Sequence, residues 1–405
     1  MKTAESILTN YKKFHISLGL ERTQKILNML GNPENGFKCF HIAGTNGKGS
    51  TSKIINDILV ENFKNTDVKI GLFTSPHIAR YNERIRINNE NIPDYTFDKL
   101  VNLIDDFAKK NNIELTEFEL LTVVAFYYFY LKRVKYVVLE TGLGGSFDST
   151  NVIKNPLTCI ITTIDFDHTE RLGKTINEIA SQKAGIIKKN SKVVISENNL
   201  GYKTVLNKIK EENAILIDIP KVKIIFENEK NYAEIDGKKY EFNLLGSHQA
   251  DNLALALGAI NASGIKISNK AIKEALKNVK WKFRLDYNKE KNLLIDGAHN
   301  PSGIKVLREF VDERFQNKKK SFIFGCLKNK DYNKMLEILL KNEDEFYFFE
   351  FDYPNALKFD ELCEKYKVKA QKISNIKEIK DIIKKPNLKI LCGSLYMLGR
   401  LNEIL

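Results

Sequence analysis

The chain has 405 residues, 43% of them hydrophobic, so it is long enough for two domains that each bury a core. Its 64 basic and 51 acidic residues give a formal net charge of +13, which fits either solvated lysines on helix faces or a field that attracts polyanionic substrates. Five scattered cysteines, no arginine-rich stripe, no apolar run of membrane-spanning length and no signal peptide argue against disulfide or zinc frameworks, nucleic acid and membranes, and predict a cytoplasmic protein.

The first half of the chain alternates apolar, β-rich runs with helical patterns. Strands are expected at 37–43, 68–74, 136–141, 158–165 and 192–196, and helices at 50–62, 96–110, 117–132 and 176–184. Strands that alternate with helices of this length imply right-handed crossovers and a mostly parallel sheet. Ligands on such sheets bind at the carboxyl ends of the strands, so polar residues at those ends are the candidates for a site.

The second half begins with a different pattern. Residues 222–244 alternate strand and turn, with Asp236-Gly237 as a hairpin signal, and predict a small antiparallel addition to the first domain. Helices at 249–263 and 269–278 follow. The strand–helix alternation then restarts at residue 293 and continues to the end, which predicts a smaller, Rossmann-like α/β domain.

A glycine-rich turn follows the first strand and precedes a helix. It comprises Gly44, Thr45, Asn46, Gly47, Lys48, Gly49, Ser50 and Thr51. Free N–H groups and the positive dipole end at such a helix start favour phosphate, Lys48 adds a charge, and the Ser50 hydroxyl can reach Mg²⁺. The strict P-loop pattern fails at Ile42 and Gly49, so a glycine-rich turn without a ligand is the alternative.

Three polar residues follow other strands of the predicted sheet. Ser75 begins a Ser-Pro turn, which offers a hydroxyl to Mg²⁺ or is simply a turn. Glu140 ends an apolar strand, where a buried carboxylate is costly unless it is paired or bound to metal, as in phosphoryl-transfer enzymes. His168, in Asp165-Phe-Asp-His168, is either a structural histidine or a metal ligand.

The remaining candidates have two readings each. Asp148 and Asn151 lie in a polar loop and are able to hydrogen-bond a substrate heterocycle, while Lys183 ends a helix like many surface lysines. The segment 248–252 either caps its helix or reads an adenine edge. The loop 296–301 suits ribose, phosphate or a structural role.

Together these residues resemble the folylpolyglutamate synthase/dihydrofolate synthase family of the Mur ligase superfamily. The matching motifs run in order through nearly the whole chain: LGNP at 30–33, AGTNGKGST at 43–51, TSPHI at 74–78, NERI at 82–85, TEFELLT at 116–122, LETGLGG at 139–145, DSTN at 148–151, DFDH…LG at 165–173, KAGIIK at 183–188, GSHQ..N at 246–252, DGAHNP at 296–301 and GSLYMLG at 393–399. Each motif alone is modest, but the ordered set is very specific.

The resemblance implies an ATP-dependent amide ligase. ATP phosphorylates the carboxylate of a folate, and the amino group of L-glutamate attacks the acyl phosphate and releases phosphate, since phosphate leaves far more readily than hydroxide. The expected domains are an ATP- and folate-binding, P-loop-type Mur ligase domain at 1–283 and a C-terminal glutamate-ligase domain at 284–405. The expected partners are ATP, Mg²⁺, L-glutamate and a folate or dihydropteroate, with the protein acting as a monomer.

The resemblance also assigns site residues, with Lys48, Lys183 and His168 as the catalytic ones. Residues 44–51 would cradle the ATP phosphates, and Asn252, Arg284, Asp296 and His299 match positions that contact the nucleotide. Ser50, Ser75, Glu140 and His168 look like ligands of one or two Mg²⁺ ions. Lys183 matches a lysine that is carbamylated and so orients a second Mg²⁺. Glu119, Asp148 and Asn151 match positions near the substrate.

Two departures from the family pattern bear on function. Trp281-Lys-Phe-Arg284 replaces the usual Pro-Gly-Arg, so the residue before Arg284 is not a glycine and the backbone there is stiffer. Ser146-Phe147 replaces the Arg-Leu of many bifunctional members in a loop expected to touch the pterin, which makes a polyglutamate synthase without dihydrofolate synthase activity one alternative. A cell-wall amino-acid ligase and a non-catalytic P-loop nucleotide-binding protein are further alternatives.

Overall fold

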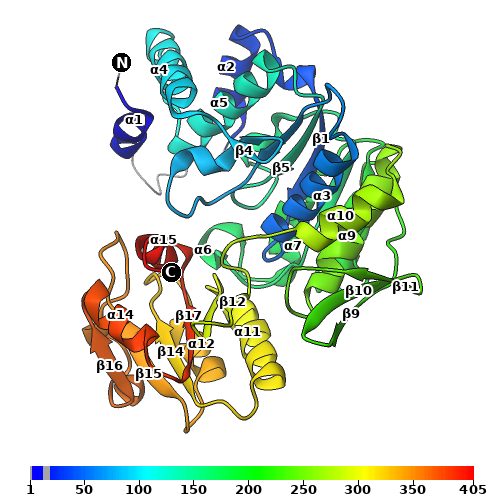
Figure 1. The fold of residues 1–405 in the computed structure, drawn as a ribbon. Helices are drawn as coiled ribbons and strands as arrows, with labels where there is room; N and C mark the ends of the chain where they lie inside the picture. The colour runs from blue at the N-terminus through cyan, green and yellow to red at the C-terminus, as the bar shows by residue number, and fades with distance from the viewer. Residues whose placement is uncertain (1, 12–18) are drawn as a thin grey trace. The chain divides into compact units, whose positions relative to one another are not determined.

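Eight strands form one mostly parallel sheet in the computed structural model, which describes residues 2–11 and 19–405 (Figure 1). Their order is β4 (Glu90–Asn91), β3 (Ile85–Ile87), β2 (Ile70–Phe73), β5 (Tyr136–Glu140), β1 (Lys38–Ala43), β6 (Thr158–Ile161), β7 (Lys192–Ile195) and β8 (Ile215–Leu216). β2, β5, β1, β6, β7 and β8 run parallel, and β3 and β4 add an antiparallel hairpin at one edge. The predicted mostly parallel sheet is confirmed.

Helices connect these strands and cover both faces of the sheet. They are α1 (Ala4–Asn10), α2 (Glu21–Met29), α3 (Lys48–Asn62), α4 (Asp94–Lys110), α5 (Glu117–Leu131), α6 (Thr169–Leu172), α7 (Ile176–Ala184) and α8 (Tyr202–Glu211), with short 3-10 turns η1 (Pro33–Gly36), η2 (Tyr81–Arg84) and η3 (Ser149–Val152). The sequence of α5 is apolar on almost every side, as expected for a helix buried in a core. Its Phe126 and Phe129 rings contact Phe37 edge-on, with centroids 5.5 and 6.0 Å away.

The predicted antiparallel addition is a three-stranded sheet. β9 (Val222–Glu227), β10 (Lys230–Ile235) and β11 (Lys238–Glu241) form it. The hairpin turn has φ of 47° at Asp236 and 78° at Gly237, the left-handed values that a two-residue turn of this kind needs. α9 (Gln249–Ser263) and α10 (Asn269–Asn278) follow, and α10 packs against α3 and β11 (Figure 1).

The C-terminal part is a second, smaller α/β layer structure. Its sheet has the order β12 (Asp286–Asn288), β13 (Leu293–Ile295), β17 (Leu388–Cys392), β14 (Lys320–Phe324), β15 (Glu345–Phe349) and β16 (Ala370–Ile373), parallel except for β12. The helices are α11 (Pro301–Arg314), α12 (Tyr332–Leu339), α13 (Glu364–Lys367), α14 (Ile376–Ile383) and α15 (Leu395–Leu401), with η4 at Phe359–Glu361. The Rossmann-like prediction is confirmed. Buried phenylalanines such as Phe322 and Phe346 fill its core, each stabilising the fold by about 1.5–3 kcal/mol.

The chain forms two compact units. The first consists of Met1–Asp165, Thr169–Asn243 and Ala250–Val279, and the second of Phe166–His168, Leu244–Gln249 and Lys280–Leu405. The main part of the second unit therefore begins four residues before the boundary expected at 283/284. Two short segments that lie earlier in the sequence, Phe166–His168 and Leu244–Gln249, also belong to it, which the strand–helix pattern did not indicate.

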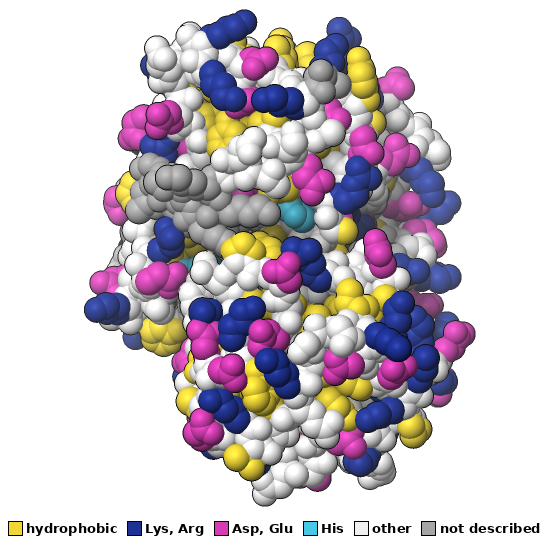
Figure 2. Space-filling view, turned by 90° about the vertical axis from the view of Figure 1, so that its left-hand side faces the viewer, with side chains coloured by type: hydrophobic (Ala, Val, Ile, Leu, Met, Phe, Trp, Pro, Cys, Tyr) yellow, Lys and Arg dark blue, Asp and Glu magenta, His cyan; other side chains and the backbone are white. Residues whose placement is uncertain are grey.

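The surface charges are mixed in sign. On the face shown in Figure 2, Lys and Arg side chains are interspersed with Asp and Glu side chains. Ion pairs between exposed residues, such as Lys305 with Glu309 and Lys384 with Asp381, agree with solvated charges on helix faces. Among the described residues, no helix combines the length and the apolar character that crossing a membrane requires.

Candidate active site

The turn between β1 and α3 brings the backbone very close to its neighbours. Gly47 is the N-cap of α3 and has φ of 88°, a left-handed value that favours glycine. A Cβ at Gly44 would lie 1.7 Å from Thr162 Oγ1, and a Cβ at Gly47 would lie 2.3 Å from Asn252 Oδ1. Gly44 is therefore required by space and Gly47 by its backbone conformation. The helix begins at Lys48, two residues earlier than predicted.

The segment after β6 holds this turn in place. Thr45 N–H donates to Thr163 O at 2.6 Å. Thr45 Oγ1 also donates to Asp165 O and accepts from Asp165 N–H, both at 3.0 Å. The strand predicted for 158–165 was too long: β6 ends at Ile161, because after Thr162, whose N–H still donates to Ala43 O of β1, the chain bonds to the glycine turn. Asp165 thus supports the loop through its backbone.

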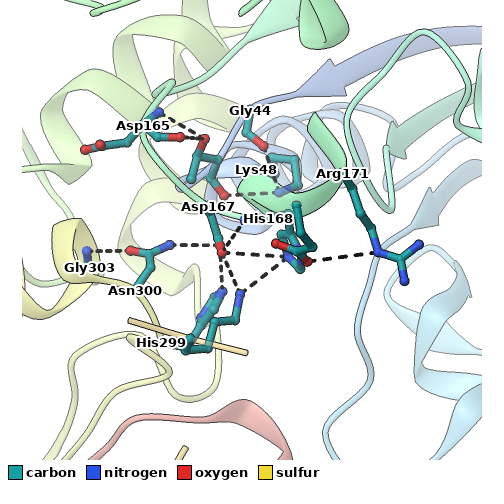
Figure 3. Close-up of polar contacts among 12 residues, drawn as sticks. Gly44, Lys48, Asp165, Asp167, His168, Arg171, His299, Asn300 and Gly303 are labelled. Carbon is teal, nitrogen blue, oxygen red and sulfur yellow. Dashed lines mark hydrogen bonds and ion pairs between the residues drawn. The ribbon is translucent and has the colours of Figure 1, made fainter. Parts of the chain in front are cut away.

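Two lysine ammonium groups converge on the same carbonyl oxygen of the turn. Lys48 Nζ donates to Gly44 O at 3.0 Å and to Thr45 O at 3.2 Å, a contact visible in Figure 3. Lys183, near the end of α7 and only 3% exposed, donates to Gly44 O at 2.7 Å. Two cations beside a helix N-terminus make a strongly electropositive site, which suits phosphate groups. Lys183 is therefore no surface lysine.

The other helix-start residues of the turn are also placed. Ser50 and Thr51 are buried in the first turn of α3, and Thr51 Oγ1 donates to Asn252 Oδ1 at 3.4 Å. Asn252, from α9, thereby lies against the glycine turn, which matches its expected place beside a nucleotide. The nucleotide contact itself stays a prediction.

Ser75 and Glu140 meet at the carboxyl ends of the neighbouring strands β2 and β5. Ser75 N–H donates to Glu140 Oε2 at 3.3 Å, and Glu140 is 3% exposed. Mg²⁺ is commonly held by one or two carboxylates together with water and substrate phosphates. A carboxylate and a hydroxyl residue side by side fit that donor set. Within residues 2–11 and 19–405, no three His, Cys, Asp or Glu side chains gather as a metal site, so any ion here needs oxygen from other groups.

Three expected substrate residues have partners within the chain. Asp148 Oδ2 accepts from the N–H groups of Gly142 and Leu143 at 2.8 Å, and its Oδ1 accepts from Thr150. Asn151 donates to the carbonyl oxygens of two further loop residues. The Asp148 carboxylate and the Asn151 amide therefore organise the backbone after β5, and the substrate roles of both residues stay predictions.

Glu119 is engaged in the same way. It closes a capping box at the start of α5 with Thr116, accepting the Thr116 N–H at 2.6 Å. Its other oxygen pairs with Arg22 Nη2 at 2.9 Å. A buried carboxylate needs such partners, and the structure supplies them without a ligand.

In the second unit, the loop after β13 is built around Asp296. Its two oxygens accept the N–H groups of Leu285 and Ala298 at 2.7 and 2.8 Å, and burial raises its pKa. The Arg284 guanidinium lies against the same loop, because a Cβ at Gly297 would be 2.5 Å from Arg284 Nη1. Phe283 has φ of 61°, a strained value for a large side chain, where the family pattern has glycine.

His299, in the same loop, is neutral at pH 7. Its Nδ1–H donates to Gly297 O at 2.8 Å, and burial lowers its pKa to about 4. Its Nε2 lies 3.7 Å from Asp167 Oδ2. At neutral pH this contact is therefore no ion pair.

Asp167 is the centre of a polar cluster that the sequence analysis missed (Figure 3). Lys330 Nζ donates to its Oδ1 at 2.6 Å, and Asn300 Nδ2 donates to its Oδ2 at 3.1 Å. Lys330 holds the pKa of this carboxyl well below its usual range against the effect of burial. His168, next in sequence, donates its N–H to Asp167 Oδ1 at 2.9 Å. One signal in the sequence pointed to a member of this cluster: the Asn-Pro pair at 300–301 is typical of a helix start, which places Asn300 at the N-cap.

Family models cover most of the chain. Residues 42–260 match the Mur ligase middle domain, and residues 279–404 match the dihydrofolate synthetase C-terminal domain. The first match spans more than half of the 405 residues. Both fall on parts of the chain that form an α/β sheet of their own.

Individual relatives match along nearly their whole length. The chain is 34% identical to a dihydrofolate synthase/folylpolyglutamate synthase of Bacillus subtilis, over 99% of this chain and 98% of that protein. It is 30% identical to a dihydrofolate synthetase of Saccharomyces cerevisiae, over 96% and 98%. A solved bifunctional folylpolyglutamate synthase/dihydrofolate synthase from Yersinia pestis, complexed with AMPPNP and Mn ion, superposes with a TM-score of 0.87 at 26% identity, over 100% and 98%.

The ordered motifs, the two α/β units and these matches agree with one another. The chain therefore belongs to the dihydrofolate synthase/folylpolyglutamate synthase family of the Mur ligase superfamily.

Proposed function

We propose that this protein is an ATP-dependent ligase that joins L-glutamate to the carboxylate of dihydropteroate and of tetrahydrofolate through an acyl phosphate. The observation that carries this proposal is the glycine-lined start of α3, where Lys48 Nζ donates to Gly44 O and Thr45 O. An electropositive, glycine-lined helix start is suited to a transferring phosphoryl group. In relatives of the same family, the names state the same two activities.

Each part of the turn has a task in phosphoryl transfer. The backbone of residues 44–51 would bind the ATP phosphates, and Lys48 would move from the carbonyl oxygens to the β- and γ-phosphates. Asn252, Arg284 and His299 would contact the rest of the nucleotide. Asp296 would act indirectly, since its carboxylate is occupied in shaping the loop that carries His299.

A divalent ion, which we propose to be Mg²⁺, would neutralise charge between the phosphate oxygens. Glu140 and Ser75 have oxygen atoms suited to this ion and contact each other. Ser50 on the glycine turn and the imidazole of His168 would be further ligands. The Yersinia pestis relative was solved with Mn ion, which supports a divalent metal.

Lys183 would act as a carbamate. Its neutral amine adds to CO₂ and loses one proton, which converts a cation into a carboxylate-like anion. The carbamate nitrogen keeps one hydrogen, so the bond to Gly44 O at 2.7 Å survives the modification. A buried anion at this position would help to orient a second divalent ion.

The remaining reaction needs orientation more than a protein nucleophile. Once the carboxylate is phosphorylated, the glutamate amine attacks the acyl carbon and phosphate leaves. We assign folate and the ATP phosphates to the first unit, and glutamate together with the nucleotide contacts of Arg284 and His299 to the second. The acyl phosphate hydrolyses in water, so loops that close over it would protect it.

The test is product identification with the full chain. The protein is incubated with MgATP, L-glutamate and either dihydropteroate or tetrahydrofolate, and phosphate release and product mass are measured. Turnover of both substrates is expected. Turnover of tetrahydrofolate alone would restrict the activity to polyglutamylation and implicate Ser146-Phe147, while turnover of neither by protein that binds ATP would refute the folate assignment.

A further inference from the structure

A buried histidine of β1 lies behind the loop that follows β5. His41 has no exposed surface, and its Nε2 lies 2.9 Å from Thr150 Oγ1 in the turn η3. Thr150 Oγ1 donates in turn to Asp148 Oδ1 at 2.5 Å. The other Asp148 oxygen accepts the N–H groups of Gly142 and Leu143, both at 2.8 Å. One chain of hydrogen bonds therefore connects a core strand to this loop, and all of its members belong to the first unit.

The direction of these hydrogen bonds follows from the donors that Asp148 receives. Its two oxygens accept four of them: the two loop N–H groups, the Thr150 N–H at 3.1 Å and the Thr150 hydroxyl. An ionised carboxylate has lone pairs for four donors, so the one Thr150 hydroxyl proton points to Asp148 and the hydroxyl oxygen accepts from His41. His41 therefore carries its proton on Nε2.

The unpaired ring nitrogen of His41 agrees with this direction. Its Nδ1 has no hydrogen-bond partner among the residues that the structure describes. With the proton on Nε2, Nδ1 is an acceptor without a donor. The opposite tautomer would bury an N–H group without an acceptor, and buried unpaired N–H groups are rarer in proteins than unpaired acceptors.

A buried polar chain of this kind constrains geometry more than it adds stability. Apolar side chains of similar size at positions 41 and 150 would pack without any hydrogen-bond partner to satisfy. The Asp148 carboxylate is buried, its four donors are neutral groups, and burial raises its pKa. Without the Thr150 hydroxyl, this carboxylate would turn toward other donors or take up a proton. Residues 142 and 143 would then lose their fixed acceptor.

The loop 142–148 lies between two parts of the predicted site. It begins two residues after Glu140, the proposed metal ligand, and ends at Asp148, which is the N-cap of η3. The turn η3 carries Asn151, so both residues that match substrate positions are attached to this loop. The glycine turn 44–51 is held separately, by bonds to the segment after β6. A shift of the loop would therefore move the expected substrate contacts and leave the phosphate-binding turn in place.

We propose that His41 and Thr150 are positioning residues that hold the loop 142–148 through Asp148 and thereby set the affinity for the pterin-bearing substrate. The proposal deepens the function proposed above and rests on the substrate roles predicted for Asp148 and Asn151. His41 and Thr150 do not contact substrate themselves, because neither has any exposed surface. Both act through the Asp148 carboxylate.

The first measurement is amide hydrogen exchange of the peptide that contains residues 142–143 in the full chain, which needs neither substrate nor turnover. Thr150→Val keeps the shape of the side chain and removes the hydroxyl, so exchange of this peptide should rise. Thr150→Ser keeps the hydroxyl and should protect the peptide as the unsubstituted chain does. Ser149→Ala is the matched control, because the Ser149 hydroxyl lies 2.6 Å from Thr122 Oγ1 in the same buried turn and does not lead to the loop.

A second pair of substitutions tests His41. His41→Gln keeps an amide N–H close to the position of Nε2, whereas His41→Leu removes the donor. His41→Leu should raise exchange of the same peptide, and adding Thr150→Val to it should have much less than an additive effect. His41→Gln should keep most of the protection. With ¹⁵N-labelled histidine, magnetic resonance should show the His41 ring as the Nε2–H tautomer.

Steady-state kinetics separates positioning from a general loss of structure. Thr150→Val and His41→Leu should raise KM for dihydropteroate and for tetrahydrofolate about tenfold, as expected when a hydrogen bond to a charged group is lost, and leave KM for ATP unchanged. Ser149→Ala should change neither constant. Peptides of the second unit, with exchange as in the unsubstituted protein, confirm that each variant is folded.

Three results would overturn the proposal. They are unchanged exchange of the peptide 142–143 in folded Thr150→Val, a His41 ring with its proton on Nδ1, and a KM for ATP that rises by the same factor as KM for the pterin-bearing substrate. Loss of protection in both variants of a protein that forms no amide would instead contradict the proposed function alone.

Discussion

Lys183 is the residue whose chemistry differs most from its surroundings. It is buried near the end of α7, and its ammonium donates to Gly44 O at 2.7 Å in the turn that also receives Lys48. As an ammonium it adds charge that repels a metal ion. As a carbamate it would attract one, so its modification state decides the electrostatics of the turn.

Removal of Lys183 separates these two roles. Lys183→Ala should lower kcat by roughly 10²–10³-fold, because a charge aimed at the reacting groups is lost. Formate or acetate should restore part of the rate by supplying the missing carboxylate. The control is Lys189→Ala, an exposed lysine just beyond the same helix, which should keep full activity. Full activity of Lys183→Ala without additives would show that no carbamate is needed.

At the scale of single residues, the sequence predicted what local patterns encode. Gly44, Gly47 and Lys48 were found from the glycine turn, since their spacing is contiguous. The Lys330–Asp167 pair was not found, because its members are 163 positions apart and each resembles an ordinary charged loop residue. Only the fold brings them together.

At the scale of elements, a buried polar chain links β1 to the turn η3. His41 Nε2 lies 2.9 Å from Thr150 Oγ1, and Thr150 donates to Asp148 at 2.5 Å. Because that hydroxyl proton is used, His41 donates from Nε2, and its Nδ1 has no hydrogen-bond partner among the described residues. Burial lowers the pKa of His41 to about 3, so the ring is neutral in the folded protein.

The buried state of His41 in this polar chain predicts that the stability of the protein depends on pH. The folded pKa of His41 lies below the unfolded value of about 6.5, so its contribution is complete above pH 6.5 and decreases as the pH falls toward 3. In denaturant unfolding between pH 6 and 4.5, His41→Gln should reduce the slope of unfolding free energy against pH by up to about 1.4 kcal/mol per pH unit. Parallel curves for the two proteins would contradict a buried neutral His41.

The predicted ends of helices and strands agree with the structure at some elements and differ at others. α7 and α10 begin and end where the helical periodicity predicted, since caps and apolar faces agree there. The strand predicted for 158–165 ends four residues early, at Ile161, because the glycine turn takes its hydrogen bonds. The edge strands β3 and β4 were missed, being only three and two residues long.

At the scale of the whole molecule, the alternation of strands and helices was enough to predict two α/β units. It did not predict that Phe166–His168 and Leu244–Gln249 belong to the second unit, because such short segments are assigned by tertiary contacts alone. The predicted metal ligand His168 and the predicted phosphate-binding lysine Lys48 thus lie in different units.

The central claim is that this chain activates a carboxylate as an acyl phosphate. Dihydropteroate labelled with ¹⁸O in both carboxylate oxygens would be incubated with MgATP, L-glutamate and the full chain, and the released phosphate analysed by mass. Transfer of the phosphoryl group to the carboxylate and attack by the amine leave one carboxylate oxygen on phosphate. The account predicts one ¹⁸O per phosphate released with amide formation, whereas unlabelled phosphate alongside amide product would contradict it.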